Sequence, residues 1–181
     1  MSRRNRKTKE LFYVELRIAG KVPLLVQPLI KQKMIDGLKW SCEKRGLRIY
    51  DYSILPNRIV MIANTAWGSL ADVLESYKGY TSKAAMLILR NGKPGLETSW
   101  MVSVFQEFGP QNKPEGIHIW EAEPLIQSLF KQDDIDQNAL KIQQMAVMLG
   151  FVMKPEHYVD CSANPKNPLN GWIVEATDPW S

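Results

Sequence analysis

The sequence has few of the side chains on which most catalytic sites depend. Its 181 residues include two histidines, His118 and His157, and two cysteines, Cys42 and Cys161. Neither pair has the spacing of a metal site or a redox pair, and the chain has no CxxC motif. It also lacks a glycine-rich phosphate loop and the GxSxG motif of serine hydrolases. We therefore expect no cofactor and no bound metal.

Long apolar runs are absent as well. No stretch of about 18 apolar residues occurs, so the sequence predicts no membrane-spanning helix and no membrane partner. The first ten residues, MSRRNRKTKE, are charged, and the apolar stretch of a signal peptide does not follow them. Two cysteines without a pattern suit a reducing compartment, so we expect a cytoplasmic protein. The length and the hydrophobic fraction of 45% fit one domain.

The excess of positive charge lies at one end of the chain. Residues 1–9 contain five of the 23 cations and none of the 19 acids, so the rest of the chain has 18 cations against 19 acids, a net charge of −1. A short basic arm of this kind commonly contacts phosphates, because each lysine or arginine releases counterions from nucleic acid. The cations of this arm are candidate nucleic-acid contacts: Arg3, Arg4, Arg6, Lys7 and Lys9.

Residue spacing predicts the first two elements that follow the arm. A strand is expected over residues 10–20, because every second residue from Phe12 to Ile18 is apolar. A helix is expected over residues 28–45, because apolar residues recur every four positions there. It would begin at a proline, which has no N–H to leave unpaired, and end before Gly46.

The rest of the chain continues the same alternation of strands and helices. Two strand-like runs, 47–55 and 58–64, are joined by two polar-turn residues and predict an antiparallel hairpin. A helix is expected from a serine cap at Ser69 to about residue 92, and a second one over 133–149. Residues 93–116 are rich in glycine and proline, so they are expected to be irregular.

This order of elements predicts the fold class. β-α-β-β-α is the order of the split βαβ arrangement, so we expect an α+β protein with a ferredoxin-like antiparallel sheet and helices on one face. The predicted division of the chain is a basic flexible arm at 1–9, a single domain at 10–163 and an irregular C-terminal extension at 164–181. A fold of this kind is compatible with many functions.

Four segments resemble a known family. GLRIYDYSILPNRIVMIAN is similar to the stretch of HUH single-strand DNA transposases that reads roughly "Y-x-x-M-P-N-H-V-H-L-L". SLADVLESYKGYTSKAA resembles their helix "LS-x-I-x-x-x-F-K-x-F-T-S-K", and IHIWEAEP resembles their tryptophan-containing strand. DQNALKIQQMAVMLGFVMKPEHYVDCSA resembles the segment that holds their catalytic tyrosine. The likeness is to the branch of REP-associated tyrosine transposases, and it extends over residues 10–163.

The resemblance implies that the catalytic residues are substituted. In that family two histidines on a strand hold a divalent metal, together with a polar ligand four residues beyond the tyrosine that attacks DNA. The histidines correspond here to Arg58 and Val60, the tyrosine to Lys141 and the third ligand to Met145. Arginine is a permanent cation, valine has no lone pair, and methionine is a poor ligand for Mg²⁺ or Mn²⁺. Lysine cannot form the phosphotyrosine link.

Three functions are compatible with these observations. The first is a transposase-like protein that binds single-stranded or hairpin DNA through Arg58, Lys141 and the arm, and that has lost strand cleavage and transposition. The second is a protein-interaction scaffold that keeps only the fold, which the charge of −1 outside the arm favours. The third is an active transposase or nuclease that uses unrecognised residues, for which Tyr77 and Tyr80 are the candidates. Related transposases often act as dimers, so the resemblance also implies a possible homodimer.

Overall fold

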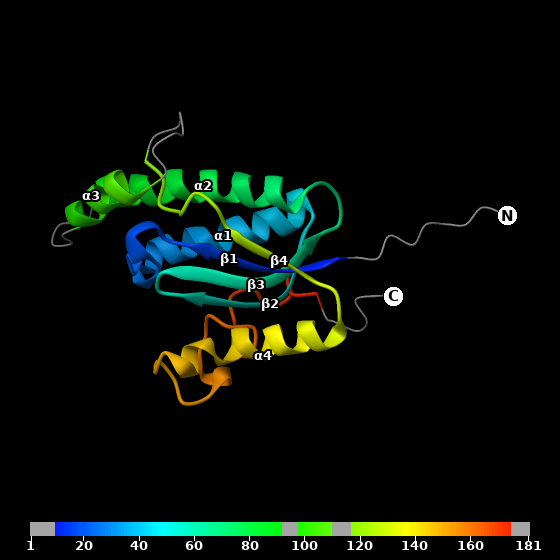
Figure 1. Cartoon of the computed structure of the whole chain (residues 1–181). Helices are drawn as coiled ribbons and strands as arrows, with labels where there is room; N and C mark the ends of the chain where they lie inside the picture. The colour runs from blue at the N-terminus through cyan, green and yellow to red at the C-terminus, as the bar shows by residue number, and fades with distance from the viewer. Residues whose placement is uncertain (1–9, 92–97, 110–116, 175–181) are drawn as a thin grey trace.

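The fold is organised around a four-stranded antiparallel sheet with helices on both faces (Figure 1). The computed structural model describes residues 10–91, 98–109 and 117–174. The strands are β1 (Leu11–Arg17), β2 (Leu47–Leu55), β3 (Arg58–Thr65) and β4 (Leu125–Leu129). The helices are α1 (Pro28–Arg45), α2 (Leu70–Arg90), α3 (Ser99–Phe108) and α4 (Gln132–Met148), and three short 3-10 helices are η1 (Ala19–Lys21), η2 (Leu24–Val26) and η3 (Pro155–His157).

The strands lie in the order β2-β3-β1-β4. The hairpin of β2 and β3 pairs as the sequence predicts, with Leu55 opposite Arg58 at its turn. Strand β1 lies between β3 and β4, and its last residue, Arg17, is the register partner of Arg58. The α+β class and the antiparallel sheet are thus confirmed.

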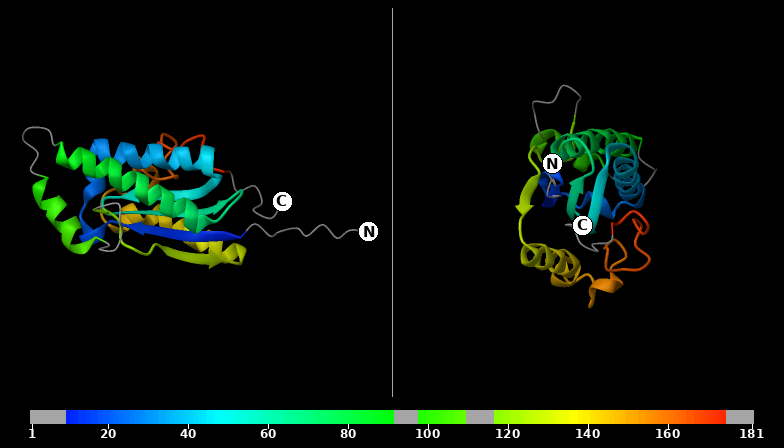
Figure 2. Two further views of the ribbon diagram at one scale, coloured as in Figure 1. Left: turned by 90° about the horizontal axis from the view of Figure 1, so that it is seen from above. Right: turned by 90° about the vertical axis from the view of Figure 1, so that its right-hand side faces the viewer.

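One face of the sheet forms the larger hydrophobic core with α1 and α2. It receives the even-numbered side chains of β1, which the alternation predicted, and both helices lie across it (Figure 2). The two helices approach closely at Gly37 of α1, where a Cβ would lie 2.9 Å from Cε2 of Tyr77 on α2. Helix α1 has the predicted bounds and ends at Gly46, whose φ of 71° is the left-handed conformation that glycine adopts without strain.

The opposite face of the sheet is also apolar, and α4 covers it. The prediction of helices on one face is therefore correct for α1 and α2 but wrong for α4. Leu11, Tyr13, Val60 and Ile62 point away from α1 and α2 and form a second cluster with α4 residues, among them the buried Ile142. The cause is that β1 and β3 are apolar on both faces, so neither face can remain in water.

Two elements escaped the sequence prediction. Residues 99–108 form helix α3, whose Met101 and Phe105 pack into the larger core although the surrounding segment is rich in glycine and proline. Strand β4 begins only at Leu125, after the tryptophan-containing segment that was expected to be the strand. Trp120 in that segment makes one bridge to Ile18 and is held by a 2.9 Å hydrogen bond from its Nε1 to Thr81 Oγ1.

The segment after α4 returns to the outer edge of β2. Cys161 bridges Ser53, and Ile173 bridges Ile49 in parallel fashion. Leu169 is fully buried in the larger core. The part of the predicted C-terminal extension that the structure describes, residues 164–174, therefore packs on the sheet. Among the described helices, none has the length and apolarity needed to cross a membrane.

The packing of α4 can be tested by truncating one side chain on its buried side and one on its exposed side. Replacing the fully buried Ile142 by alanine should lower the free energy of unfolding by about 2–5 kcal/mol, because it leaves a cavity against the sheet. The matched change Leu140→Ala, on the same helix but 60% exposed, should cost less than about 0.5 kcal/mol. Urea unfolding followed by circular dichroism measures both. Equal effects would contradict the placement of α4.

Candidate nucleic-acid interface

A buried carboxylate near the end of β1 organises the polar part of the α4 face. Glu15 is 5% exposed, and its Oε1 accepts hydrogen bonds from Arg17 Nε at 2.9 Å and from Arg58 Nη1 at 3.1 Å. Its other oxygen, Oε2, accepts a hydrogen bond from the hydroxyl of Tyr13 at 3.3 Å. Four residues of two neighbouring strands are thereby joined in one network.

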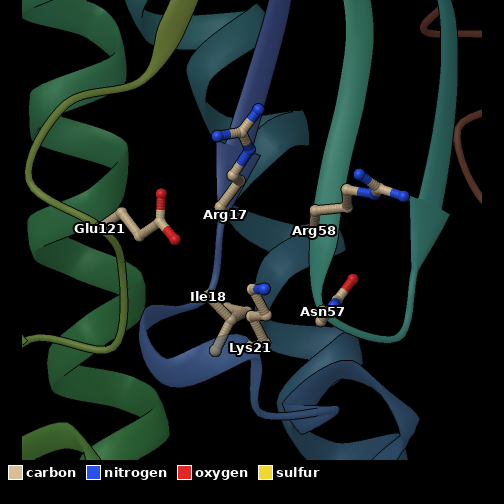
Figure 3. Close-up of a pocket in the computed structure, with 6 residues that line it drawn as sticks. All are labelled: Arg17, Ile18, Lys21, Asn57, Arg58 and Glu121. Carbon is tan, nitrogen blue, oxygen red and sulfur yellow. The ribbon is translucent and has the colours of Figure 1, made fainter. Parts of the chain in front are cut away.

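The strand register explains why this carboxylate is needed. Arg17 and Arg58 are direct partners on adjacent antiparallel strands, and two like charges in that position repel each other. Glu15 precedes Arg17 by two residues, so its side chain lies on the same face and reaches both arginines. The two guanidinium groups lie on neighbouring strands in Figure 3, and they share one negative charge.

The network shifts the titration of its members. Burial by itself raises the pKa of a carboxyl group, but the hydrogen bonds and charges of Arg17 and Arg58 outweigh it and hold the pKa of Glu15 below its usual 4.5. The same hydrogen bond raises the pKa of Arg17. Burial, together with the charge of Glu15, raises the pKa of Tyr13 to about 12. At neutral pH the network therefore contains two cations, one anion and a neutral tyrosine.

Lys141 reaches the same network from α4. Its Nζ lies 5.1 Å from the centroid of the Tyr13 ring, a cation–π contact between the helix and the sheet. Arg58 and Lys141 thus lie on the same side of the sheet, and Tyr13 and Glu15 connect them. Helix α4 therefore packs on the face of the sheet from which Arg58 projects. The five cations of the arm, residues 1–9, lie outside the described residues.

The positions at which the resembled family holds a metal do not fit one here. Val60 is fully buried and Met145 is 8% exposed, and both belong to the apolar cluster beneath α4. Arg58 is bonded to Glu15 and offers no lone pair. In the described part of the chain, no group of three or more histidine, cysteine, aspartate or glutamate side chains could hold a metal ion. Arg58, Val60 and Met145 offer neither the oxygen nor the imidazole ligands that such an ion needs.

The two tyrosines considered as substitute nucleophiles differ in environment. Tyr77 is 2% exposed, its hydroxyl donates to the carbonyl of Met34, and burial raises its pKa well above 10. It packs against α1 and Trp120 in the larger core, on the other side of the sheet from Lys141. Tyr80 is 51% exposed on α2. A buried, fully protonated phenol cannot attack a phosphodiester, so Tyr77 is structural.

The sequence prediction missed three members of the site: Tyr13, Glu15 and Arg17. Their common signal was visible in the strand pattern, because odd-numbered residues of β1 change from apolar at Leu11 to charged at Arg17. That change marks the point along the strand where the second face of the sheet stops being covered. Side-chain exposures of 48% for Arg17 and 32% for Arg58 are consistent with this.

Comparison with known proteins supports the fold at low sequence identity. No protein-family model matches the chain, and no curated protein matches it in sequence. Among solved structures, the chain is similar to a REP-associated tyrosine transposase bound to a REP hairpin, with a TM-score of 0.57, 13% identity, and coverage of 98% of this chain and 93% of that one. A protein of Deinococcus radiodurans assigned as a transposase matches with a TM-score of 0.47, 11% identity, and coverage of 80% and 97%.

The chain therefore has the fold of a REP-associated tyrosine transposase. This agrees with the resemblance seen in the sequence motifs. At 13% identity the match concerns the arrangement of helices and strands and not the chemistry of the site.

The ion pairs of Glu15 predict a pH-dependent stability. Because the folded pKa of Glu15 is lowered, its stabilisation is complete above the unfolded pKa of about 4.5 and disappears as the pH falls through the folded value. Glu15→Gln should therefore lower the free energy of unfolding by about 1–3 kcal/mol at pH 7, and by less below about pH 4. Urea midpoints from pH 3 to pH 8 measure this difference. Glu43→Gln, which breaks an exposed pair with Lys44, is the control and should have little effect.

The site also predicts how the protein responds to divalent cations. Since Arg58, Val60 and Met145 supply no suitable ligand, titration calorimetry with Mn²⁺ should detect no stoichiometric binding. If the unchanged protein bound Mn²⁺ stoichiometrically and Glu15→Gln bound it equally well, a metal site would lie elsewhere in the chain.

Proposed function

We propose that this protein is a transposase-like DNA-binding protein that binds single-stranded or hairpin DNA and does not cleave it. The observation that carries the proposal is the position of Arg58 and Lys141, which lie on one side of the sheet and are connected through Tyr13 and Glu15. Arginine and lysine on ordered elements can hold backbone phosphates without a metal ion. The similar solved structure contains a DNA hairpin, which supports DNA as the partner.

The proposed loss of cleavage follows from the chemistry of the same residues. Strand transfer of the HUH type needs a Lewis acid beside the scissile phosphate and a nucleophile that can form a covalent link. Val60 of β3 and Met145 of α4 pack in the apolar cluster between the sheet and the helix, and the cation of Lys141 lies over an aromatic ring. A cation at this position can neutralise a phosphate, but it cannot form the tyrosine–DNA intermediate.

A scaffold function is the alternative that one surface feature favours. Apolar side chains are exposed at the end of α4 and in the segment that follows, with Met148 at 77%, Phe151 at 50% and Met153 at 87%. Exposed apolar side chains that are close together in the chain favour a protein contact. A homodimer, which the resemblance implies, would be one such contact, and sedimentation at several concentrations would detect it. Localisation in the cytoplasm remains a prediction from the sequence.

The basic arm and the two ordered cations should affect DNA binding differently. Deletion of residues 1–9 should flatten the salt dependence of binding, because it removes five flexible charges, and it should leave any preference for hairpins over duplex largely intact. Changing Arg58 and Lys141 together to alanine should instead reduce that preference, with a loss of roughly 1–3 kcal/mol on the hairpin. Mobility shifts with single-stranded, hairpin and duplex probes at several salt concentrations measure both effects.

Two results would change the proposed function. If the double variant bound every probe as the parent protein does, the site at Arg58 and Lys141 would not be a DNA site, and the scaffold function would be favoured. Nicking of the same probes in the presence of Mg²⁺ or Mn²⁺ would show that the protein is an active nuclease. Lys33→Ala removes a cation on the exposed side of α1, and it serves as the matched control for both assays.

A further inference from the structure

A pocket with three cations lies at the end of the sheet where β1 stops and the β2–β3 hairpin turns. It has a volume of about 340 Å³, and Figure 3 shows the residues that line it. The lining residues are Arg17, Ile18, Lys21, Asn57, Arg58 and Glu121. We call it the cation pocket. It adjoins the Glu15 network through Arg17 and Arg58, but Lys141 does not line it.

The two arginines of the cation pocket retain donors for a ligand. Each uses one nitrogen on Glu15, although a guanidinium has five N–H groups. The Nε of Arg58 is buried and has no hydrogen-bond partner in the part of the chain that the structure describes. A buried donor without a partner is unfavourable, so an acceptor that reached this donor would be stabilised. The anchoring on Glu15 holds both side chains in place before any ligand arrives.

Lys21 lines the cation pocket and has an unfavourable backbone conformation. Its φ is 56°, and among the described residues no other non-glycine residue has a positive φ. It follows Gly20, whose φ is 65°. A side chain in this conformation is unfavourable, and such outliers gather at functional sites. A glycine at position 21 would avoid the cost, but it would also remove the cation that lines the pocket. The strained turn is thus consistent with a role for the lysine side chain.

The charges around the cation pocket match a singly charged anion. Arg17, Lys21 and Arg58 supply three positive charges, and Glu15 and Glu121 supply two negative ones, which leaves one positive charge. A phosphodiester has one negative charge, whereas a terminal phosphate has about two at neutral pH. Glu121, which faces the cations, would oppose the second charge.

We propose that the cation pocket binds one backbone phosphodiester of the bound DNA strand. The proposal rests on the DNA-binding function proposed above and adds Arg17 and Lys21 to it. Arginine and lysine contacts to phosphate fix the register of a nucleic acid on a protein. A phosphate held here would lie beyond the end of β1, beside Arg58.

The first test separates the side chain of Lys21 from folding. Lys21→Gly removes both the cation and the strained backbone, so its melting temperature should equal or exceed that of the parent protein, while the affinity for a single-stranded or hairpin probe should fall about tenfold. The slope of log K for binding against log salt concentration should also become shallower by about 0.7, the value for one lost contact to a single strand. Arg17→Gln should weaken binding in the same direction, and Glu121→Gln should strengthen it. Lys33→Ala is the control for loss of a distant charge.

The second test identifies the phosphate. Probes that contain one neutral methylphosphonate at successive positions should reveal a position at which the parent protein binds more weakly and Lys21→Gly binds unchanged, because the contact is already lost. A gain in affinity from a 5′-phosphate that disappears in Lys21→Gly would instead assign the pocket to a terminal phosphate and overturn the backbone assignment. Inhibition of DNA binding by inorganic phosphate at millimolar concentration, lost in the same variant, would also overturn it.

The two proposals fail in different ways. If the parent protein binds no DNA probe, both the proposed function and the assignment of the pocket are wrong. If it binds DNA but Lys21→Gly and Arg17→Gln bind as tightly as Lys33→Ala, the DNA-binding function stands and the cation pocket is not part of it.

Discussion

The structure depends on the burial of both faces of the two central strands. β1 and β3 carry apolar side chains on each side, so two separate layers of helix are needed to remove them from water. Helices α1 and α2 form the first layer, and α4 forms the second. Where the second layer ends, Arg17 and Arg58 remain partly exposed, and the polar site begins there. The polar site therefore lies at the end of β1, beyond the apolar cluster that packs against α4.

Glu15 connects this packing to the electrostatics of the site. A single buried carboxylate allows two arginines to stand opposite each other on adjacent strands, and its second oxygen orients the tyrosine over which Lys141 lies. The carboxylate neutralises only one of the arginine charges. The site thus has an excess of positive charge that the average over the domain, −1 outside the arm, conceals. Local arrangement matters more for phosphate binding than net charge does.

The same face of the sheet has an apolar contact at two positions where the resembled family holds a metal. Val60 and Met145 contribute to the apolar contact between α4 and the sheet. A hydrated metal ion between them would require polar ligands within a packed apolar cluster, which is costly.

Local sequence was sufficient for much of the fold. The alternation in β1, the β2–β3 hairpin and the proline and glycine at the ends of α1 are properties of neighbouring residues, and the structure confirms them. The motifs also indicated that the helix containing Lys141 packs near the start of β3. α3 was missed because its two buried apolar residues lie within a segment rich in glycine and proline. The second helical layer was missed because alternation shows that a strand has two faces, not which helix covers each.

The members of the site could be found only in the tertiary structure. The role of Glu15 depends on the register that places Arg17 opposite Arg58, and that of Tyr13 depends on the position of α4. Lys21 and Glu121 are far apart in sequence and line one pocket because β1 ends beside the segment that leads into β4. By itself the sequence determined β1, α1, the β2–β3 hairpin, α2 and α4, and it showed that the ligands of the resembled family are substituted. The charge pairing and the pocket were decided by packing, since they arise from residues on different elements.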